Sequence, residues 1–260
     1  MEKDILRTGF IDLDKTINLY EPKLIFLAGR PGMGKTAFAV DIASNICLKQ
    51  DIPVLILSIE ESKNSVINRI IAKESRIDIS KIRLNELNAI EENIVQIQRK
   101  FIENSKIFIE DIGLQSVGKV IELIKKYVNE NNVKFIAIDY LQLMRYTKMS
   151  DIRVENILRQ LKQISKELKI SILITSQLSR SLLERDDCRP NIKDLINKEV
   201  ILKYADIIMF LYRENDFYKN PEKKDIAEVI IIQNDVDKII KIIFEGKYSG
   251  FKSFKEWVLL

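Results

Sequence analysis

The sequence contains no histidine, and this absence excludes several kinds of chemistry. Without an imidazole, the chain has no Ser-His-Asp triad, no histidine general base and no zinc site that needs a histidine ligand. Its two cysteines, Cys47 and Cys188, are too few for a four-cysteine metal site and leave room for one disulfide at most. We expect both thiols to be free, because a cytoplasmic chain is the simpler interpretation and the cytosol keeps cysteines reduced.

Long apolar runs are also missing. No run approaches the ~20 residues that a membrane-spanning helix needs, and residues 1–4 lack the apolar stretch of a signal peptide. The net charge of +4, from 42 Lys and Arg against 38 Asp and Glu, is too small to indicate nucleic-acid binding on its own. At 260 residues and 46% hydrophobic content, the chain is long enough to bury a core. We expect a globular, cytoplasmic protein without a membrane partner.

Glycine and proline are scarce, with 8 and 5 residues, so the apolar patterns are seldom interrupted. Short apolar, β-branched runs predict strands at 24–28, 54–59, 107–109, 135–138, 172–175, 207–211, 229–232 and 239–244. Patterns with a helical period predict helices at 36–48, 62–74, 116–128 and 153–168, with Ser62 as an N-cap. Alternating strands and helices are typical of a three-layer α/β fold with a mostly parallel sheet, and the last two strands are expected to form an antiparallel hairpin.

One glycine-rich segment carries a specific phosphate-binding pattern. Its residues are Gly29, Arg30, Pro31, Gly32, Met33, Gly34, Lys35 and Thr36, which match G-x-x-x-x-G-K-[ST] in full. The segment lies between an apolar strand and a helix, where backbone N–H groups and the helix N-terminus favour an anion. The pattern predicts that Lys35 contacts the β- and γ-phosphates of a nucleotide, and that the Thr36 hydroxyl ligates Mg²⁺.

Three further polar residues follow predicted strands. Asp139 ends an apolar strand, as a carboxylate that supports Mg²⁺ does in P-loop enzymes. Glu60 follows the second strand and is a candidate to orient or deprotonate a water; the alternative is an acidic residue that stabilises a helix N-terminus. Gln177 follows the fifth strand and is a candidate γ-phosphate sensor; the alternative is an ordinary polar residue at a strand end.

Taken together, these motifs resemble the C-terminal, RecA-like ATPase domain of DnaB-type replicative helicases. The matching segments include Thr8-Gly9-Phe10, the P-loop, Leu57-Ser58-Ile59-Glu60, Asp139-Tyr140-Leu141-Gln142-Leu143-Met144, Ser176-Gln177-Leu178-Ser179-Arg180 and the stretch from Asp206 to Arg213. They occur in order over nearly the whole chain. The resemblance implies a short N-terminal entry segment at 1–22 and a RecA-like P-loop NTPase domain at 23–260. It also implies catalytic roles for Lys35, Glu60, Asp139 and Gln177.

The resemblance further implies Mg-ATP hydrolysis in a hexameric ring that translocates on single-stranded DNA during replication. The loops after Asp139 and Gln177 would then face the central channel. Their basic residues are candidate phosphate contacts, and solvated loop charge is the alternative for each. The candidates are Arg145, Lys148, Arg180, Arg185, Arg189, Lys193 and Lys198.

The chain departs from the family pattern in three places. The family's N-terminal domain and most of its linker helix have no counterpart in these 260 residues, which leaves open a diverged relative without them or a fragment of a longer helicase. The basic finger that acts on the neighbour's ATP is replaced by Gln233-Asn234-Asp235, with Lys238 and Lys241 as the nearest cations. An Arg-Glu-Ser-Gly segment is replaced by Ile196-Asn197-Lys198-Glu199. These departures keep an alternative open: a RecA-like ATPase, or a catalytically weak helicase-fold module that binds and modulates a full-length helicase or another protein of DNA metabolism.

Overall fold

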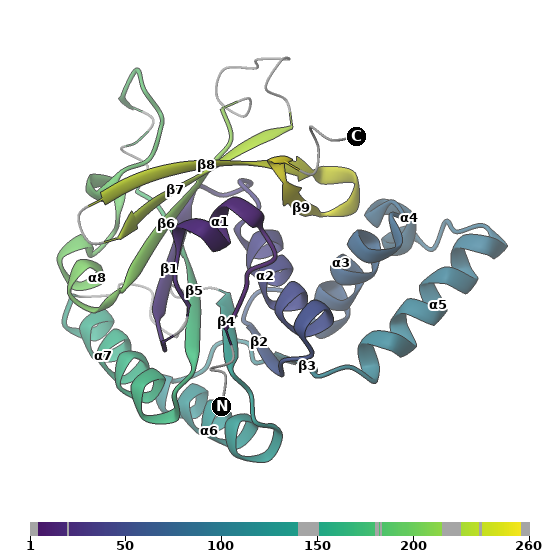
Figure 1. Ribbon diagram of the computed structural model, residues 1–260, viewed down its shortest axis with the longest axis horizontal. Helices are drawn as coiled ribbons and strands as arrows, with labels where there is room; N and C mark the ends of the chain where they lie inside the picture. The colour runs from purple at the N-terminus through teal and green to yellow at the C-terminus, as the bar shows by residue number, and fades with distance from the viewer. Residues whose placement is uncertain are drawn as a thin grey trace.

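A nine-stranded sheet forms the centre of the described part of the computed structural model (Figure 1). The structure describes residues 5–19, 21–139, 151–179, 182, 184–214, 225–233 and 236–255, with only the backbone of 151, 152 and 236. In spatial order the strands are β3 (Ile107–Asp111), β2 (Val54–Ser58), β4 (Phe135–Asp139), β5 (Ser171–Gln177), β1 (Leu24–Gly29), β6 (Ile207–Tyr212), β7 (Ile226–Gln233), β8 (Val236–Glu245) and β9 (Gly250–Ser253). The first six run parallel and the last three antiparallel. The predicted parallel sheet and C-terminal hairpin are confirmed.

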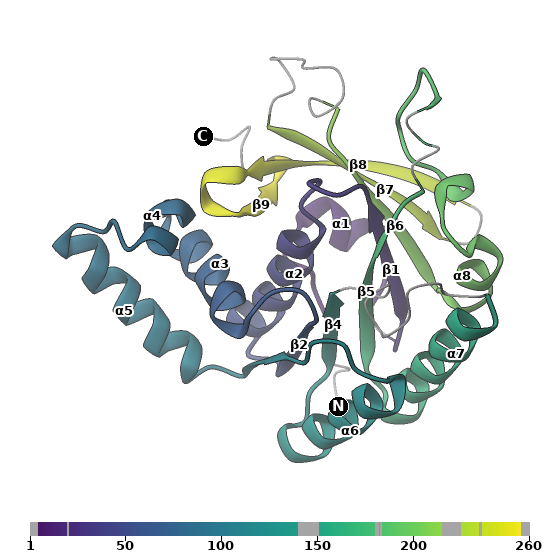
Figure 2. The same cartoon turned by 180° about the vertical axis from the view of Figure 1, so that it is seen from behind.

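Helices cover both faces of this sheet, which gives the predicted three layers (Figures 1 and 2). On one face lie α1 (Ile11–Thr16), α2 (Lys35–Gln50) and α3 (Lys63–Ser75), and on the other lie α6 (Val117–Asn131), α7 (Asp151–Leu168) and α8 (Lys198–Tyr204). In strand β1, Ile25 and Leu27 join the core beneath α2, whereas Leu24 and Phe26 join the core beneath α7. Strands that are buried on both faces need continuous apolar runs, and this is why the sequence shows them without polar alternation.

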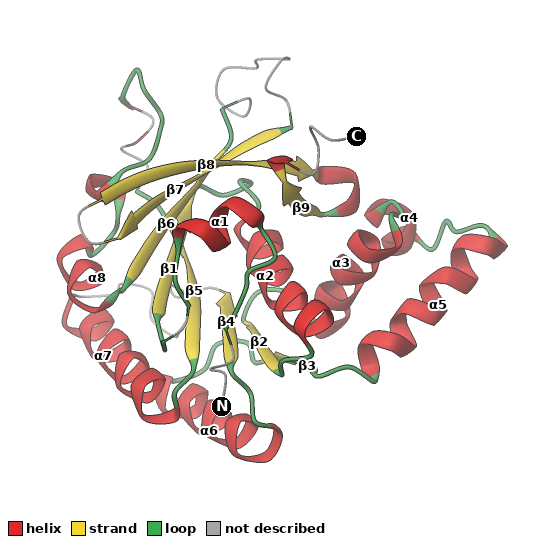
Figure 3. Cartoon of the chain, viewed as in Figure 1, coloured by secondary structure: helices red, strands yellow, loops and turns green. Residues whose placement is uncertain are grey.

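Some elements were not predicted from the sequence. Helices α4 (Ile79–Leu84) and α5 (Ala89–Glu103) extend beyond the β3 edge of the sheet, as the red helices of Figure 3 show. Helix α5 begins with a capping box in which Asn88 and Glu91 exchange side-chain-to-backbone hydrogen bonds. Strand β9 is short and interrupted by polar residues, so it lacks the apolar pattern of the other strands. The predicted N-cap of α3 is confirmed, because the Ser62 hydroxyl accepts a hydrogen bond from the Ser65 amide.

The carboxyl ends of β1, β2, β4 and β5 meet at one edge of the sheet. Gly29 pairs with Gln177, and Ser58 pairs with Asp139. Parallel α/β sheets bind ligands at this edge. The predicted site residues therefore come from four neighbouring strand ends, although they are far apart in the sequence. Among the helices of the described residues, none has the length and apolar content that crossing a bilayer requires.

Candidate nucleotide-binding site

The P-loop connects β1 to α2 in the conformation that an anion-binding loop needs. Gly32 and Gly34 have φ values of +82° and +94°, which glycine adopts without strain. Gly34 is the N-cap of α2, and its carbonyl accepts the Phe38 amide at 2.9 Å. A Cβ atom at Gly34 would lie 2.9 Å from the Phe251 ring, so there is no space for a side chain. The loop therefore presents a helix N-terminus, with its partial positive charge, to the site.

Lys35 lies inside this loop. Its Nζ donates a hydrogen bond of 2.9 Å to the Arg30 carbonyl oxygen. Burial lowers the pKa of Lys35, while the nearby carboxylates of Asp139 and Glu60 act in the opposite direction and Arg30 lowers it further. The Lys35 ammonium group is half-buried and bonded to its own loop. When a nucleotide binds, this group can donate to phosphate oxygens in place of the Arg30 carbonyl oxygen.

The Asp139 carboxylate is fixed by two hydroxyl groups. Thr36 Oγ1 donates to Asp139 Oδ2 at 2.6 Å, and Thr175 Oγ1 donates to Asp139 Oδ1. Asp139 is buried, with 6% of its surface exposed. The pairing of Thr36 with Asp139 brings together the two residues that were predicted to serve Mg²⁺. Thr175 was not predicted, because a threonine inside an apolar strand gives no sign of a polar role.

Most of the predicted nucleotide-site residues meet around one cavity of about 450 Å³; the exceptions are Gly29, Arg30 and Met33 of the P-loop, which do not line it. Glu60 reaches it from the segment after β2, and Gln177 from the end of β5. Its lining residues are Pro31, Gly32, Gly34, Lys35, Thr36, Ala37, Glu60, Glu61, Arg69, Ile79, Arg83, Asp139, Gln177, Phe244, Gly246 and Ser249. This set combines backbone amides, a cation, a hydroxyl group and carboxylates, the usual ligands of a magnesium nucleotide.

A cation–aromatic pair stands at the same cavity and was not predicted. The Arg213 guanidinium lies 3.8 Å from the centroid of the Phe244 ring, and Arg213 Nη1 donates to the Gly32 carbonyl oxygen at 3.2 Å. Arg213 follows β6 and Phe244 belongs to β8, so the pair depends on the antiparallel strands that follow the parallel sheet. A flat guanidinium and a flat ring beside a phosphate loop offer stacking surfaces for a nucleobase.

Comparison with known proteins agrees with this geometry. The family model described as DnaB-like helicase C terminal domain matches residues 6–253. The chain belongs to this family. It is 37% identical over 258 residues to the replicative DNA helicase DnaB of Haemophilus influenzae, covering 96% of this chain and 55% of that protein. It is 34% identical over 251 residues to the replicative DNA helicase DnaC of Bacillus subtilis, covering 94% of this chain and 55% of that protein. The chain thus spans about half the length of these curated relatives.

Solved structures of the family share the fold. One solved ATPase domain matches with a TM-score of 0.87 and 31% identity, over 96% of this chain and 91% of that one. A DnaB-like replicative helicase, whose structure was determined to study its interactions with primase, matches with a TM-score of 0.86 and 31% identity, over 96% and 62%. The RecA-like P-loop fold and a nucleotide-binding site are therefore shared with DnaB-like ATPase domains.

The predicted DNA-contacting residues of this DnaB-like domain fall into three groups. Arg145, Lys148 and Arg180 lie outside the described residues. Arg185 and Arg189 are paired within the chain, Arg185 with Asp194 at 2.9 Å and Arg189 with both carboxylate oxygens of Glu228 at 2.8 and 3.0 Å. The hydrogen bonds that Arg189 donates to Glu228 raise the pKa of Arg189, although burial acts against them.

The remaining two candidates, Lys193 and Lys198, are exposed. Lys198 Nζ lies 3.5 Å from its neighbour Glu199. Both Lys193 and Lys198 are accessible to a phosphate backbone, whereas Arg185 and Arg189 first have to leave their carboxylate partners. The DNA interface therefore stays a prediction, with the two lysines as its most available members.

The hairpin between β7 and β8 lies where the family carries its basic finger. Gln233 pairs with Val236, and residues 234 and 235 lie outside the described part of the chain. Lys238 and Lys241 are exposed on β8, opposite Ile231 and Glu228 respectively. Both are therefore accessible, and Lys238 is three residues nearer to the hairpin turn.

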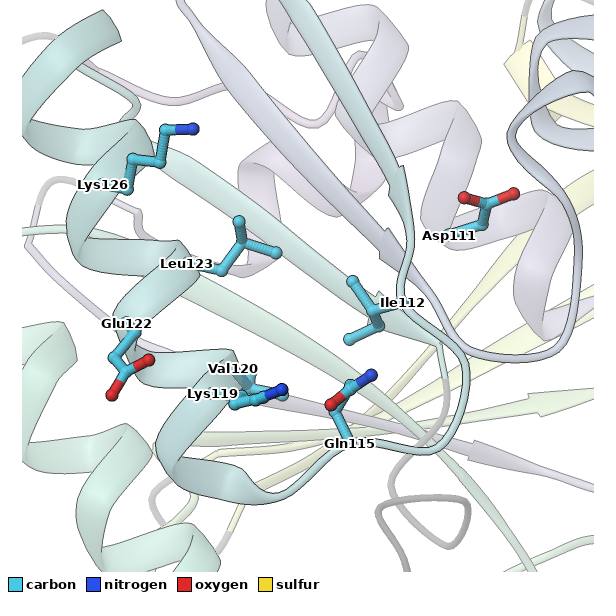
Figure 4. A pocket seen from close by; sticks show the side chains of 8 residues that line it. All are labelled: Asp111, Ile112, Gln115, Lys119, Val120, Glu122, Leu123 and Lys126. Carbon is cyan, nitrogen blue, oxygen red and sulfur yellow. The ribbon is translucent and has the colours of Figure 1, made fainter.

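A second cavity, of about 410 Å³, lies between α6 and the segment after β3 (Figure 4). The side chains of Ile112, Val120 and Leu123 form its apolar part. The other lining residues are Asp111, Gln115, Lys119, Glu122 and Lys126. It shares no lining residue with the nucleotide site, and its mixed surface charges indicate no particular ligand.

Proposed function

We propose that this chain is the ATP-hydrolysing motor of a replicative DNA helicase, which couples turnover of Mg-ATP to movement along single-stranded DNA. The observation that carries the proposal is that Lys35, the Thr36–Asp139 pair, Glu60 and Gln177 converge on one cavity. The relatives named above are replicative helicases, and they supply the DNA part of the proposal.

The phosphate side of the site is assigned as follows. The P-loop amides and Lys35 hold the β- and γ-phosphates. Thr36 and Asp139 would hold Mg²⁺, since this cation prefers oxygen ligands and takes one or two from protein beside the phosphates. When bound, Mg²⁺ would neutralise the negative charge that develops on the phosphates. Thr175, which donates to Asp139, would keep this carboxylate oriented, and the Thr36 hydroxyl would be a further oxygen ligand of the cation.

The reacting side of the site belongs to Glu60 and Gln177. Glu60 is exposed at the cavity, so its carboxylate can accept a hydrogen bond from the attacking water and orient it. Gln177 stands beside Gly29 of the P-loop in the strand register, and we assign its amide to the γ-phosphate. The base is assigned to the Arg213–Phe244 pair, beside which an adenine ring can stack.

Assembly into a ring is the second part of the proposal. On α5 the residues Ile90, Ile94, Ile97 and Phe101 are spaced four, three and four apart, which is the pattern of a helix–helix seam, although Ile94 is partly buried against the core. Ile90, Ile97 and Phe101 are 75%, 56% and 55% exposed. We assign this stripe to a helix of a neighbouring copy. Sedimentation of the protein should show an oligomer that Phe101→Glu dissociates; an unchanged oligomer would reject the assignment.

Two matched variants test the catalytic assignment. Glu60→Gln keeps size and hydrogen bonding but removes the base, so nucleotide affinity should stay within a few-fold while turnover falls by ~10²-fold or more. Lys35→Ala should lose affinity and turnover together, because it removes a phosphate contact. Affinity is read from a fluorescent ATP analogue and turnover from phosphate release. Turnover that survives in Glu60→Gln would show that Glu60 is not the catalytic carboxylate. Turnover that survives in Lys35→Ala would show that ATP is not hydrolysed at this site.

A further inference from the structure

The proposed catalytic residue Glu60 lies within a short turn that the next residue, Glu61, helps to close. Ser58 Oγ donates to the Glu61 carbonyl oxygen at 2.6 Å and accepts the Glu61 amide at 3.1 Å. The Ile59 amide donates to the Asp139 carbonyl oxygen at 2.8 Å. Hydrogen bonds thus hold the backbone on both sides of Glu60, and Glu61 closes the turn beside it.

Arg69 of α3 holds the Glu61 side chain. Arg69 Nε donates to Glu61 Oε2 at 2.9 Å and Arg69 Nη2 donates to Glu61 Oε1, while Ser65 Oγ donates to Glu61 Oε2 at 2.8 Å. Burial acts to raise the pKa of Glu61, but the hydrogen bonds and charge of Arg69 outweigh it and lower the pKa. Glu61 is therefore ionised at neutral pH, and the two parallel bonds fix the pair in one geometry.

The third nitrogen of the same guanidinium reaches a different wall of the cavity. Arg69 Nη1 donates to Ser249 Oγ. Ser249 is buried in the turn between β8 and β9 with a φ of +53°, and this turn also contributes Gly246 to the cavity. Phe244, one residue before the end of β8, belongs to the proposed base site. One arginine thus connects the turn that holds Glu60 to the wall proposed for the base.

We propose that Glu61, Arg69 and Ser249 form a positioning bridge that sets the Glu60 carboxylate relative to the bound nucleotide. The inference rests on the catalytic role proposed for Glu60. The three bridge residues also line the cavity, but none is assigned to the reacting atoms, and the proposal is that they act through Glu60. Losing it should leave nucleotide bound but badly aligned with its water, and errors of about 1 Å in such an alignment can cost ~10²-fold in rate.

The chain contains a matched control on the same two elements. Arg76 follows α3 and makes a bidentate pair with Glu245 at the end of β8, with Nη2 to Oε1 at 2.8 Å. Arg76 also stacks on Tyr248, 4.0 Å from the ring centroid. Like Arg69, Arg76 ties α3 to the β8–β9 turn, but these contacts include no residue of the Glu60 turn. Arg76→Ala therefore removes a tether of the same kind without releasing Glu61.

The experiment compares kcat, KM and ATP-analogue affinity for Arg69→Lys, Glu61→Gln and Arg76→Ala. Arg69→Lys and Glu61→Gln should each lower kcat by ~10-fold or more and change affinity by less than ~3-fold, because alignment and not binding is lost. Arg76→Ala should keep kcat within ~2-fold. The exchange Glu61→Arg with Arg69→Glu should recover part of the lost rate. An unchanged kcat in Arg69→Lys and Glu61→Gln, or an equal loss in Arg76→Ala, would overturn the bridge.

Glu60→Gln separates this inference from the proposed function. If Glu60→Gln is inactive while Arg69→Lys and Glu61→Gln turn over like the parent, the bridge is wrong and the role of Glu60 stands. If Glu60→Gln remains active, the role of Glu60 is wrong and the bridge has nothing to position. Melting temperatures of all variants show whether each remains folded. A variant that unfolds is replaced by Ser249→Ala, which removes one hydrogen bond and is expected to lower kcat with affinity retained.

Discussion

The Asp139 carboxylate has a separate hydrogen-bond donor for each of its two oxygens. Asp139 is nearly buried, so each of its oxygens needs a hydrogen-bond donor when no cation is present. Thr36 and Thr175 supply one donor each. Only Thr36 belongs to a motif. Thr175 was found from the structure alone, because the sequence marks position 175 only as part of a strand.

Thr175→Val tests the importance of the second donor. Valine matches threonine in shape, so the strand should fold while Asp139 Oδ1 loses its partner. Residues that orient a metal ligand typically contribute 10–100-fold to metal affinity or activity, so the Mg²⁺ concentration for half-maximal turnover should rise roughly 10-fold. A magnesium titration of phosphate release measures this value. An unchanged titration curve would mean that Asp139 is oriented without Thr175.

Among the elements, α2 connects the P-loop to the strands at the C-terminal end of the chain. Its first turn packs against aromatic rings: Phe38 of α2 lies 5.4 Å from Phe251 of β9, and Phe251 lies 5.0 Å from Phe244 of β8, measured between ring centroids. Aromatic side chains of β8 and β9, the last two strands of the chain, thus pack against the P-loop and the first turn of α2. This support could not be predicted, because β9 lacks a strand pattern and no sequence signal pairs Gly34 with Phe251.

Gly34→Ala should therefore destabilise the fold as well as the site. The left-handed conformation costs about 1–2 kcal/mol for a residue with a Cβ atom, and the contact with Phe251 adds ~1–3 kcal/mol of overpacking. Gly113→Ala is the matched control, because Gly113 also has a positive φ, of +53°, but nothing lies within 4 Å of its added Cβ. Urea unfolding should show that Gly34→Ala lowers the free energy of unfolding more than Gly113→Ala does. Equal decreases in the two variants would contradict the packing argument.

A buried carboxylate ties α2 to two other elements. Asp41 Oδ2 accepts the Phe251 amide of β9 at 2.6 Å, and Asp41 Oδ1 lies 3.0 Å from Lys73 Nζ of α3. Burial raises the pKa of Asp41 to about 6, against the opposing effect of Lys73. The folded state therefore binds a proton more tightly than the unfolded state, whose Asp pKa is about 3.9. The resulting stabilisation is complete below pH 4 and is lost as the pH rises through about 6.

Asp41→Asn removes this titration and serves as its test. Between pH 4 and 6.5, the free energy of unfolding of the parent protein should fall relative to that of Asp41→Asn, since only the parent has to release a buried proton. Urea unfolding at half-unit pH steps measures the difference. A difference that is constant, or that changes in favour of the parent as the pH rises, would show that Asp41 does not titrate in this range.

For the whole molecule, the parts with a repeating pattern were predictable. The apolar strands, the helices over 36–48 and 153–168 and the P-loop follow from local sequence, and the order of the sheet places their polar ends together. The Arg213–Phe244 pair and the Glu61–Arg69–Ser249 bridge were not predictable. Their members come from separate elements, and only the pairing of β6 to β9 and the packing of α3 bring them together.

The central claim is that this chain couples ATP turnover to single-stranded DNA. The most direct test is phosphate release from Mg-ATP with and without single-stranded DNA, with Lys35→Ala as the blank. The account predicts measurable turnover that DNA stimulates several-fold and that Lys35→Ala abolishes. Turnover that is the same with and without DNA would contradict it, because the nucleotide site would then work without a connection to the loops proposed to contact DNA.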